Sequence, residues 1–180
     1  KTQIALYKEW REVLQFGDFY RGRNFSGFGT GSEHILEHGN LQEWTCVSPD
    51  QKKAVGFLMQ KLAVPNTQFA CYKAKGLDAD AEYHFYNRKL KYNVKEFGDL
   101  VNTVSPVHIR QDSLAHNLIA RFVKMDGETE DTVVFGDALM YHGVKLKQGF
   151  GGTGYNDQVR FFPDFASRMY FMEKTGGSME

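Results

Sequence analysis

The sequence lacks an excess of charge of either sign. Its 180 residues include 22 lysines and arginines and 22 aspartates and glutamates, so the formal net charge is zero. Proteins that bind nucleic acid or anionic membranes usually present a basic surface, because those partners are negatively charged. The balance gives no electrostatic support for either partner, and we predict no nucleic-acid partner and no membrane partner.

Long hydrophobic runs and cysteines are also scarce. No apolar run approaches the roughly 18 residues that a membrane-spanning helix needs, and no signal peptide is visible. The two cysteines, Cys46 and Cys71, both lie in predicted strands. We interpret them as buried, reduced thiols rather than as a disulfide or a metal pair, because free cysteine is among the most buried residue types.

What the sequence contains is typical of a folded domain with additional rings. Apolar residues make up 42%, charged residues 24% and aromatic residues 14%, which is a globular composition rather than a disordered one. The length is sufficient for one hydrophobic core. We therefore expect a single domain with an attached helix.

The first 14 residues predict an amphipathic helix. Apolar side chains recur there at three- and four-residue steps, as on one face of a helix, and residues 18–21 then predict the start of a strand. Because the chain begins at Lys1 rather than at a methionine, we expect that it is cut from something longer. The helix would then belong to a preceding domain. The apolar positions are Ile4, Leu6, Tyr7, Trp10, Val13 and Leu14.

Strands and turns dominate the next part of the chain. Residues 42–48 and 52–64 predict two strands joined by the Ser48-Pro49-Asp50 turn, where proline presets the backbone angle. Residues 69–74 and 82–86 predict a second hairpin, bent at Gly76-Leu77-Asp78.

A glycine-rich loop and later strands complete the predicted β pattern. Five glycines in residues 22–40 predict a long loop. Residues 132–147 and 165–173 predict further strands, with residues 166–171 half-buried. Antiparallel strands joined by short turns favour a β-sandwich or a curved sheet.

Two helices are predicted in the middle of the chain. The first ends before Pro106, and the second begins after Asp112 or Ser113 as N-cap. The fold class we predict is therefore mainly β, an antiparallel β-sandwich with an N-terminal helix and two inserted helices. The helical positions are Val94, Phe97, Leu100, Val101 and Val104, then Leu114, Leu118, Ile119, Phe122 and Met125.

Two short motifs imitate cofactor sites. His34-Ile35-Leu36-Glu37-His38 matches the H-x-x-E-H zinc signature, but it lies among glycines in a predicted loop rather than on a helix. Residues 149–154 match G-x-G-x-x-G without the strand, the helix and the distant acidic residue that a dinucleotide site requires. We interpret both as loops, and we predict no metal site and no cofactor.

Carboxylates are plentiful, and glycoside hydrolysis usually needs two of them on either side of the scissile bond. Most of these aspartates sit beside residues typical of turns, where aspartate caps turns and helix starts. We therefore predict no catalytic residue in this chain. Acyl-transfer chemistry has no support, because no serine lies in a nucleophile elbow and no histidine stands near a cysteine. The aspartates include Asp18, Asp50, Asp78, Asp80, Asp137, Asp157 and Asp164.

Aromatic residues form two clusters, one near the first helix and one near the end of the chain. Exposed rings could stack on sugars, but rings also dominate cores and interfaces between domains. We favour core or interface over sugar contact. The clusters are Phe16, Phe19, Tyr20, Phe25 and Phe28, and Phe150, Tyr155, Phe161, Phe162 and Phe165.

Four segments stand out along the chain, in the order Trp44–Asp50, Lys75–Tyr83 (KGLDADAEY), Gly136–Met140 (GDALM) and Asp164–Tyr170 (DFASRMY). Together they resemble, in the same order, segments of the C-terminal domain of glycoside hydrolase family 36 α-galactosidases. The chain from Tyr7 to Arg21 is similar to the junction between the catalytic barrel and that domain. The sequence departs from the family pattern in residues 91–132 and 148–154.

The resemblance implies a division of the chain and a parent enzyme. Residues 1–16 would be the last helix of the barrel, 17–175 the C-terminal β-sandwich domain and 176–180 a tail. The parent would be a retaining glycosidase that releases terminal α-galactose from melibiose- and raffinose-type sugars. Its two catalytic aspartates would lie upstream of Lys1, and it would need no cofactor. The resemblance also implies a cytoplasmic, bacterial homo-oligomer.

Three functions remain in competition. The chain could be a non-catalytic cap packed on the catalytic barrel, a carbohydrate-binding module with an exposed aromatic platform, or a self-contained enzyme. The N-terminal helix favours the first, because a freestanding module would not need its apolar face. We expect this chain alone to have no galactosidase activity.

Overall fold

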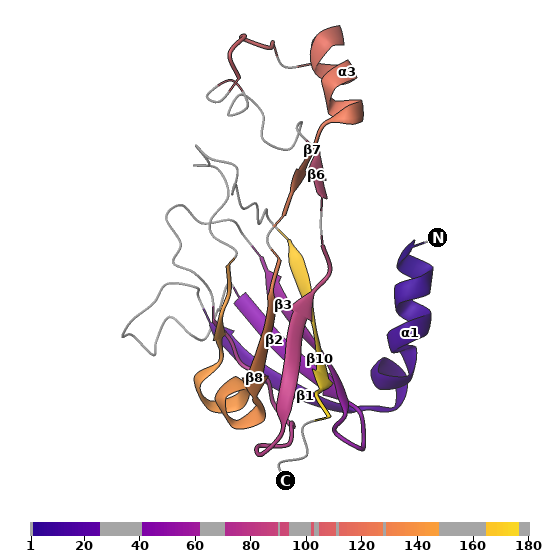
Figure 1. Cartoon of the computed structure of the whole chain (residues 1–180), viewed down its shortest axis with the longest axis vertical. Helices are drawn as coiled ribbons and strands as arrows, with labels where there is room; N and C mark the ends of the chain where they lie inside the picture. Colours follow the sequence, from indigo (N-terminus) through magenta and orange to yellow (C-terminus); the bar gives the residue numbers. More distant parts are fainter. Residues whose placement is uncertain are drawn as a thin grey trace.

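The computed structural model describes residues 2–25, 41–61, 71–89, 91–93, 102, 105–110, 112–127, 129–147 and 165–176. The elements are shown in Figure 1. In chain order they are α1 (Thr2–Phe16), β1 (Asp18–Phe25), β2 (Leu41–Val47), β3 (Lys53–Gln60), β4 (Cys71–Tyr72), β5 (Glu82–Asn87), β6 (Lys91–Asn93), α3 (Leu114–Phe122), β7 (Lys124–Asp126), β8 (Asp131–Phe135), the π-helix η3 (Ala138–His142), β9 (Val144–Lys145) and β10 (Ser167–Lys174).

Six antiparallel strands form the main sheet, in the order β1-β2-β3-β10-β5-β8. β10 lies between β3 and β5, so residues near the end of the chain join the two halves of the sheet. The predicted strands at 42–48, 52–64 and 165–173 correspond to β2, β3 and β10, although β3 ends at Gln60. The predicted turn after β2 is present, where the Ser48 amide donates to the Lys53 carbonyl over 2.8 Å.

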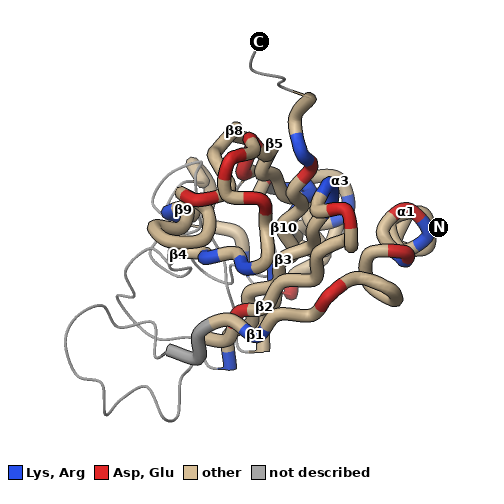
Figure 2. The backbone as a smooth tube through the Cα atoms, turned by 90° about the horizontal axis from the view of Figure 1, so that it is seen from below, with Lys and Arg blue, Asp and Glu red and all other residues tan. Residues whose placement is uncertain are grey.

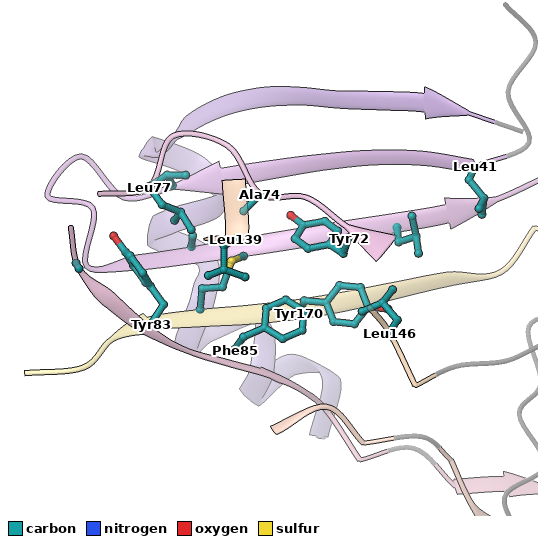
Figure 3. Packing of buried hydrophobic residues seen from close by; sticks show 14 residues of the cluster. Leu41, Tyr72, Ala74, Leu77, Tyr83, Phe85, Leu139, Leu146 and Tyr170 are labelled. Atoms are coloured by element: carbon teal, nitrogen blue, oxygen red, sulfur yellow. The ribbon is translucent and has the colours of Figure 1, made fainter. Parts of the chain in front are cut away.

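The hydrophobic core lies on one face of this sheet, which we call the inner face. Tyr83, Phe85, Tyr170 and Met172 project from it and are fully buried. The rings of Phe85 and Tyr170 stack with centroids 5.2 Å apart, and Figure 3 shows them facing Tyr72 from the opposite layer. Alternation along each strand supplies this face, because successive side chains of a strand point to opposite sides.

A second, smaller layer covers the inner face. β4 pairs with β9 in a two-stranded sheet, and η3 contributes the fully buried Leu139. Figure 2 shows β4 and β9 on one side of the main sheet and α1 on the other. The predicted fold class, a mainly β antiparallel sandwich with an N-terminal helix, is confirmed.

The predicted second hairpin is wrong. Residues 71–72 pair with 144–145, whereas β5 pairs with β10 and β8. Residues 73–81 are therefore not a tight turn but a connection that carries the chain from one layer to the other. Local turn residues at Gly76-Leu77-Asp78 could not reveal that the flanking strands belong to different sheets.

Two further boundaries differ from prediction. β1 continues through Phe25, although residues 22–40 were predicted to be a loop. Gly22 is needed there because a Cβ would lie 2.4 Å from the Glu43 side chain on β2. Residues 132–147 hold two short strands around η3, whose first amide is capped by Asp137 and whose end is Gly143 at φ 80°.

An arm extends from one end of the sheet. β6 and β7 pair with each other, and α3 lies beyond them (Figure 1). Of the two predicted inserted helices, the second is confirmed as α3, with Ser113 as its N-cap. Met125, predicted to be helical, lies in β7 instead. The first, predicted over residues 94–104, lies almost entirely outside the described residues.

Candidate functional site: the outer face of the sheet

The face of the main sheet opposite the core, which we call the outer face, is covered by α1. Trp10 and Val13 are buried there against Cys46, Val55 and Phe171. The Trp10 and Phe171 rings are 4.8 Å apart. The ammonium of Lys53 lies 5.3 Å from the centre of the Trp10 ring, a cation–π contact. The helix is thus firmly joined to the sheet.

Beside α1, three rings form a row across β1, β2 and β3, which we call the aromatic strip. The Phe19 and Trp44 rings are 5.1 Å apart and tilted by 59°. Trp44 stacks on Phe57 at 4.2 Å. Phe19 is 52% exposed, and the other two rings are half-buried. The strip is an apolar surface that the described chain covers only in part.

Part of the apolar face of α1 is left uncovered by the sheet. Ile4 is 61% exposed and Tyr7 49%, and the Gln15 amide donates to the Tyr7 hydroxyl over 2.9 Å. Ile4 and Tyr7 are three residues apart, and so are Tyr7 and Trp10, so Ile4 and Tyr7 form the edge of the apolar face that packs on the sheet. The sheet therefore buries only part of the apolar face of α1.

A cleft of about 280 Å³ opens between the first turns of α1 and the end of the sheet. Apolar side chains line it at Leu6, Met169 and Phe171, and polar groups at Gln3, Arg88 and Ser167. Its size and mixed lining suit a small ligand or an inserted side chain.

The predicted aromatic clusters divide between these surfaces and the core. Tyr20 packs against the inner core, whereas Phe16 and Phe19 are exposed, and so is Phe165. Sequence reasoning missed Trp44 and Phe57. Their signal was the strand alternation, which places them on the face opposite the buried Leu58 and Val47. The side chains of Phe25, Phe28, Phe150, Tyr155, Phe161 and Phe162 lie outside the described residues.

The described aspartates hold turns and ion pairs. Asp50 accepts a hydrogen bond from the Ser48 hydroxyl over 2.7 Å, and this bond is the main reason that its pKa is lowered. Asp78 accepts from the Lys174 ammonium over 2.8 Å, and that contact lowers its pKa. Asp137 accepts from the Ala138 amide at the start of η3.

The four other candidate aspartates are placed as follows. The Asp80 amide donates to the Asp78 carboxylate, and Asp18 is exposed at the start of β1. Asp157 and Asp164 lie outside the described residues.

The segments that resemble the family fit together as structural parts. A Cβ on Gly76, at φ 78°, would lie 2.2 Å from the Tyr20 ring, and one on Gly136 would lie 1.9 Å from the Asp78 carbonyl oxygen. The Tyr83 hydroxyl accepts from the Asp78 amide and donates to the Gln51 carbonyl over 2.7 Å. The KGLD and GDALM segments therefore pack closely against each other at one end of the sandwich.

The hydroxyl of Tyr72, inside the core, also has hydrogen-bond partners. The Tyr72 hydroxyl donates to the Trp44 carbonyl over 3.1 Å and lies 2.7 Å from the Thr45 hydroxyl. Complete burial raises the pKa of Tyr72. The buried Glu43 carboxylate accepts from the Lys73 amide over 3.2 Å. These bonds connect β2 to the second layer, which is a structural role.

Both cofactor-like motifs, at residues 34–38 and 149–154, lie outside the described residues. Among the described residues no group of three or more metal-binding side chains is arranged to hold an ion. Cys46 is a buried thiol whose pKa is raised by burial. Cys71 is half-buried, and its Sγ donates to the His142 carbonyl. No helix in the described part of the chain has the length and apolarity to cross a membrane.

Comparison with known proteins gives one family match. The profile described as "Glycosyl hydrolase family 36 C-terminal domain" matches residues 41–172. Among curated proteins, the chain is similar to α-galactosidase AgaA of Geobacillus stearothermophilus. It is 35% identical over 83 residues, which is 46% of this chain and 10% of AgaA.

Solved structures share the fold. The α-galactosidase of Lactobacillus brevis aligns with 99% of this chain at 21% identity and a TM-score of 0.55. AgaB of Geobacillus stearothermophilus aligns with 97% at 24% identity and a TM-score of 0.53. This chain covers 16% and 15% of those two chains. It therefore spans only a small part of the length of the relatives it matches.

Proposed function

Because the chain belongs to the glycosyl hydrolase family 36 C-terminal domain family, we propose that it is the non-catalytic accessory domain of an α-galactosidase. The catalytic domain would precede it in the same polypeptide. The complete enzyme would hydrolyse terminal α-galactosyl residues of melibiose- and raffinose-type sugars and would need no cofactor. The substrate proposal draws on its relatives, one of which, an AgaA variant, is solved in complex with raffinose.

One observation carries the accessory role: apolar surface is left open on the side of the sheet that α1 covers. The aromatic strip lies on that face, and α1 itself exposes Ile4 and Tyr7. Contiguous exposed apolar surface marks an interaction site. A preceding domain connected through α1 would adjoin this side of the sheet, and stabilising that domain is the function we assign to the surface.

The roles of the described aspartates agree with this proposal. Asp50, Asp78 and Asp137 are each engaged in a turn, an ion pair or a cap. A pair of carboxylates that works on a glycosidic bond must instead be free to approach the sugar. Accordingly, we assign no catalytic, cofactor-binding or metal-binding residue to this chain.

The test places a charge on the open apolar surface of the complete natural polypeptide. Tyr7→Lys and Phe19→Lys should each lower the melting temperature of the catalytic part, because a buried interface would have to accommodate an unpaired ammonium. Tyr141→Lys is the matched control, since Tyr141 is also an exposed ring, 70% exposed, but lies in η3 on the other layer. Calorimetry separates the transitions of the two domains.

Equal melting temperatures for all three variants and the natural protein would refute the docking surface. Activity provides an independent check of the same proposal. The 180-residue chain, once shown to be folded, should not hydrolyse an aryl α-galactoside. Turnover by pure chain, retained after repeated purification, would contradict the non-catalytic role.

A second function is favoured by the aromatic strip alone. Phe19, Trp44 and Phe57 form a row of rings, and rows of rings can stack on the apolar faces of sugars. The chain would then be a carbohydrate-binding module. Amide NMR titration with galactose, melibiose and raffinose distinguishes the two. Saturable shifts confined to the strip would favour the module, and no shifts at millimolar sugar would favour the accessory domain.

Assembly and location complete the proposal. We propose that the complete enzyme is a homo-oligomer, that this domain contributes to its subunit contacts, and that it acts in the bacterial cytoplasm. The relatives come from bacteria, which supports a bacterial source for this protein. Sedimentation of the purified enzyme tests the homo-oligomer, and fractionation of the producing cells tests the cytoplasmic location.

A further inference from the structure

The cleft beside the first turns of α1 lies where two neighbouring strands of the main sheet part. The register between β5 and β10 ends at the pair of Asn87 and Tyr170. Beyond that pair the chain leads from β5 into the arm (Figure 1), whereas residues 167–169 of β10 remain paired with β3. Gln3 and Leu6 of α1 line the same cleft. The fold itself therefore builds this space, from one helix and two strands.

One part of the lining of the cleft is apolar. Leu6 contributes from α1, and Met169 and Phe171 contribute from β10. The volume of about 280 Å³ is nearly twice that of an engineered apolar cavity of roughly 150 Å³ that binds benzene. The cleft therefore has room for an aromatic ring together with a polar substituent.

The other part of the lining carries positive charge. Arg88 and Arg168 are both among the residues that line the cleft, and none of the described residues that line it is acidic. Arg88 is exposed to solvent. Arg168 is only 8% exposed, and its Nη1 donates to the Ser167 carbonyl over 3.0 Å. Because a guanidinium has five N–H donors and no acceptor, the cleft attracts a negatively charged hydrogen-bond acceptor.

The hydrogen bonds already made at the cleft point the same way. The Asn87 Oδ1 accepts from the Glu130 amide over 2.8 Å, and the Ser167 carbonyl accepts from Arg168. Two acceptors among the lining residues are thus already engaged within the chain. An occupant that mainly donates hydrogen bonds is therefore less well served than one that mainly accepts them.

We propose that this cleft is a binding site for a small organic carboxylate with an apolar body of about one ring. The carboxylate pairs with the guanidinium of Arg88, a charge-assisted contact that arginine can make through two parallel hydrogen bonds. The apolar body covers Leu6 and Met169. Inorganic phosphate shares the anionic chemistry, but it has no apolar part with which to remove that wall from water. The inference goes beyond the accessory role, because it assigns a ligand to a place outside the aromatic strip.

Benzoate is the probe for the site, and benzamide is its neutral counterpart of nearly the same shape. Ligand-observed NMR titration of the complete natural polypeptide should show millimolar binding of benzoate, as expected for so small a ligand. Benzamide should bind at least about tenfold more weakly, because the charge-assisted hydrogen bonds are lost. Equal affinities for the two compounds would overturn the site, since recognition would then not depend on the charge.

A substitution at the cleft tests which residue provides the charge. Arg88→Gln should weaken the binding of benzoate about tenfold or more and have little effect on benzamide. Lys89→Gln is the matched control, because Lys89 is the next residue and is also exposed, but it is not among the residues that line the cleft. It should leave both affinities unchanged. Equal losses in the two variants would indicate a general attraction to positive charge and would overturn the site.

A second substitution tests the volume of the cleft. Ser167 is exposed and lines the cleft, so the indole of Ser167→Trp should fill the space and abolish the binding of benzoate. Its melting temperature should not fall, and circular dichroism should confirm that each variant is folded. Undiminished binding of benzoate by folded Ser167→Trp would place the ligand elsewhere and overturn the proposal.

The remaining outcomes assign the cleft to another occupant or to none. Inorganic phosphate that displaces benzoate with equal affinity would show that any anion suffices, which overturns the requirement for an apolar body. A lack of benzoate binding overturns the proposal as well. If Arg88→Gln and Ser167→Trp then also melt at lower temperature, a side chain of another domain fills the cleft. The accessory role is tested separately, by Tyr7→Lys and Phe19→Lys, and does not depend on these results.

Discussion

Both faces of the main sheet carry aromatic rings, but the two faces differ in how far those rings are buried. On the inner face Tyr83, Phe85 and Tyr170 are fully buried, and the second layer of the same chain covers them. On the outer face α1 buries Trp10 and Phe171, while the aromatic strip remains partly open. The chain itself thus covers the inner face of the sheet, but it covers the outer face only in part.

This difference distinguishes the rings that stabilise the domain itself from the rings that a partner could cover. A core is close-packed by residues that the chain itself supplies, and removing any of them costs stability directly. Rings that remain exposed add little to the stability of the domain, and their apolar area becomes useful only when another surface covers it. The same comparison applies to the arm, where α3 buries one side and leaves the other open.

The largest expected effect is the loss of a ring from the inner face. Phe85→Ala should lower the free energy of unfolding by about 3–5 kcal/mol, because it leaves a cavity between Tyr72 and Tyr170. Phe57→Ala, on the aromatic strip, should cost less than about 2 kcal/mol because its ring is only partly buried. Urea unfolding followed by far-UV circular dichroism measures both, and equal losses would break the distinction between the faces.

A somewhat smaller loss is expected at Gly136, which packs against the backbone of Asp78. In Gly136→Ala the new methyl group would lie 1.9 Å from the Asp78 carbonyl oxygen, so the backbone must move. We expect a loss of about 1–3 kcal/mol. Gly176→Ala is the control, because a Cβ there meets nothing within 4 Å. Thermal unfolding compares them, and a stable Gly136→Ala variant would show that the layers adjust freely.

The sequence predicted the elements of this fold better than their pairing. Periodicity located α1, β2, β3, β10 and α3 because each pattern is local. It could not assign Cys71 and Tyr72 to the second layer, because their partners at residues 144–145 are distant in sequence. The number of possible partners for a short strand is large, and turn residues alone do not choose among them.

The candidate surfaces were harder still to predict. Spacing correctly indicated that α3 is a helix, but it does not say whether the side chains of Leu118 and Phe122 are covered, and both are exposed. Trp44 and Phe57 are indistinguishable from core residues by type. Only the register of β1, β2 and β3 shows that they line up on the face away from the core. Exposure depends on what the rest of the chain covers, which no local pattern contains.

A third comparison is between the buried hydroxyl of Tyr72 and the exposed hydroxyl of Tyr7, in their contributions to stability. Tyr72→Phe removes the buried group that connects Thr45 and the Trp44 carbonyl, and we expect a loss of about 0.5–1.5 kcal/mol. Tyr7→Phe removes a hydroxyl that accepts from Gln15 at the surface, where water replaces the bond, so stability should be unchanged. Urea unfolding of both variants provides the measurement, and a larger loss for Tyr7 would contradict the open nature of its face.

The smallest expected effect concerns the ion pair between Asp78 and Lys174, which lies where the KGLD segment meets the end of β10. The contact lowers the pKa of Asp78 below its ordinary value of 3.8 and raises that of Lys174 above 10.5. A carboxyl with a lowered folded-state pKa binds fewer protons than in the unfolded chain. Its contribution to stability is therefore present above pH 3.8 and is lost as the pH falls through the folded-state pKa.

The raised pKa of Lys174 has the opposite consequence. Its contribution is present below pH 10.5 and is lost as the pH rises through the folded-state pKa. Between these limits both groups are charged, and Asp78→Asn should melt slightly below the natural protein. The difference should disappear as the pH falls through the folded-state pKa of Asp78, because the carboxyl of the natural protein then becomes neutral as well. If the Asp78→Asn difference persists unchanged at low pH, the aspartate acts at this junction through its turn geometry rather than its charge, and the two layers are joined here by hydrogen bonds and packing alone.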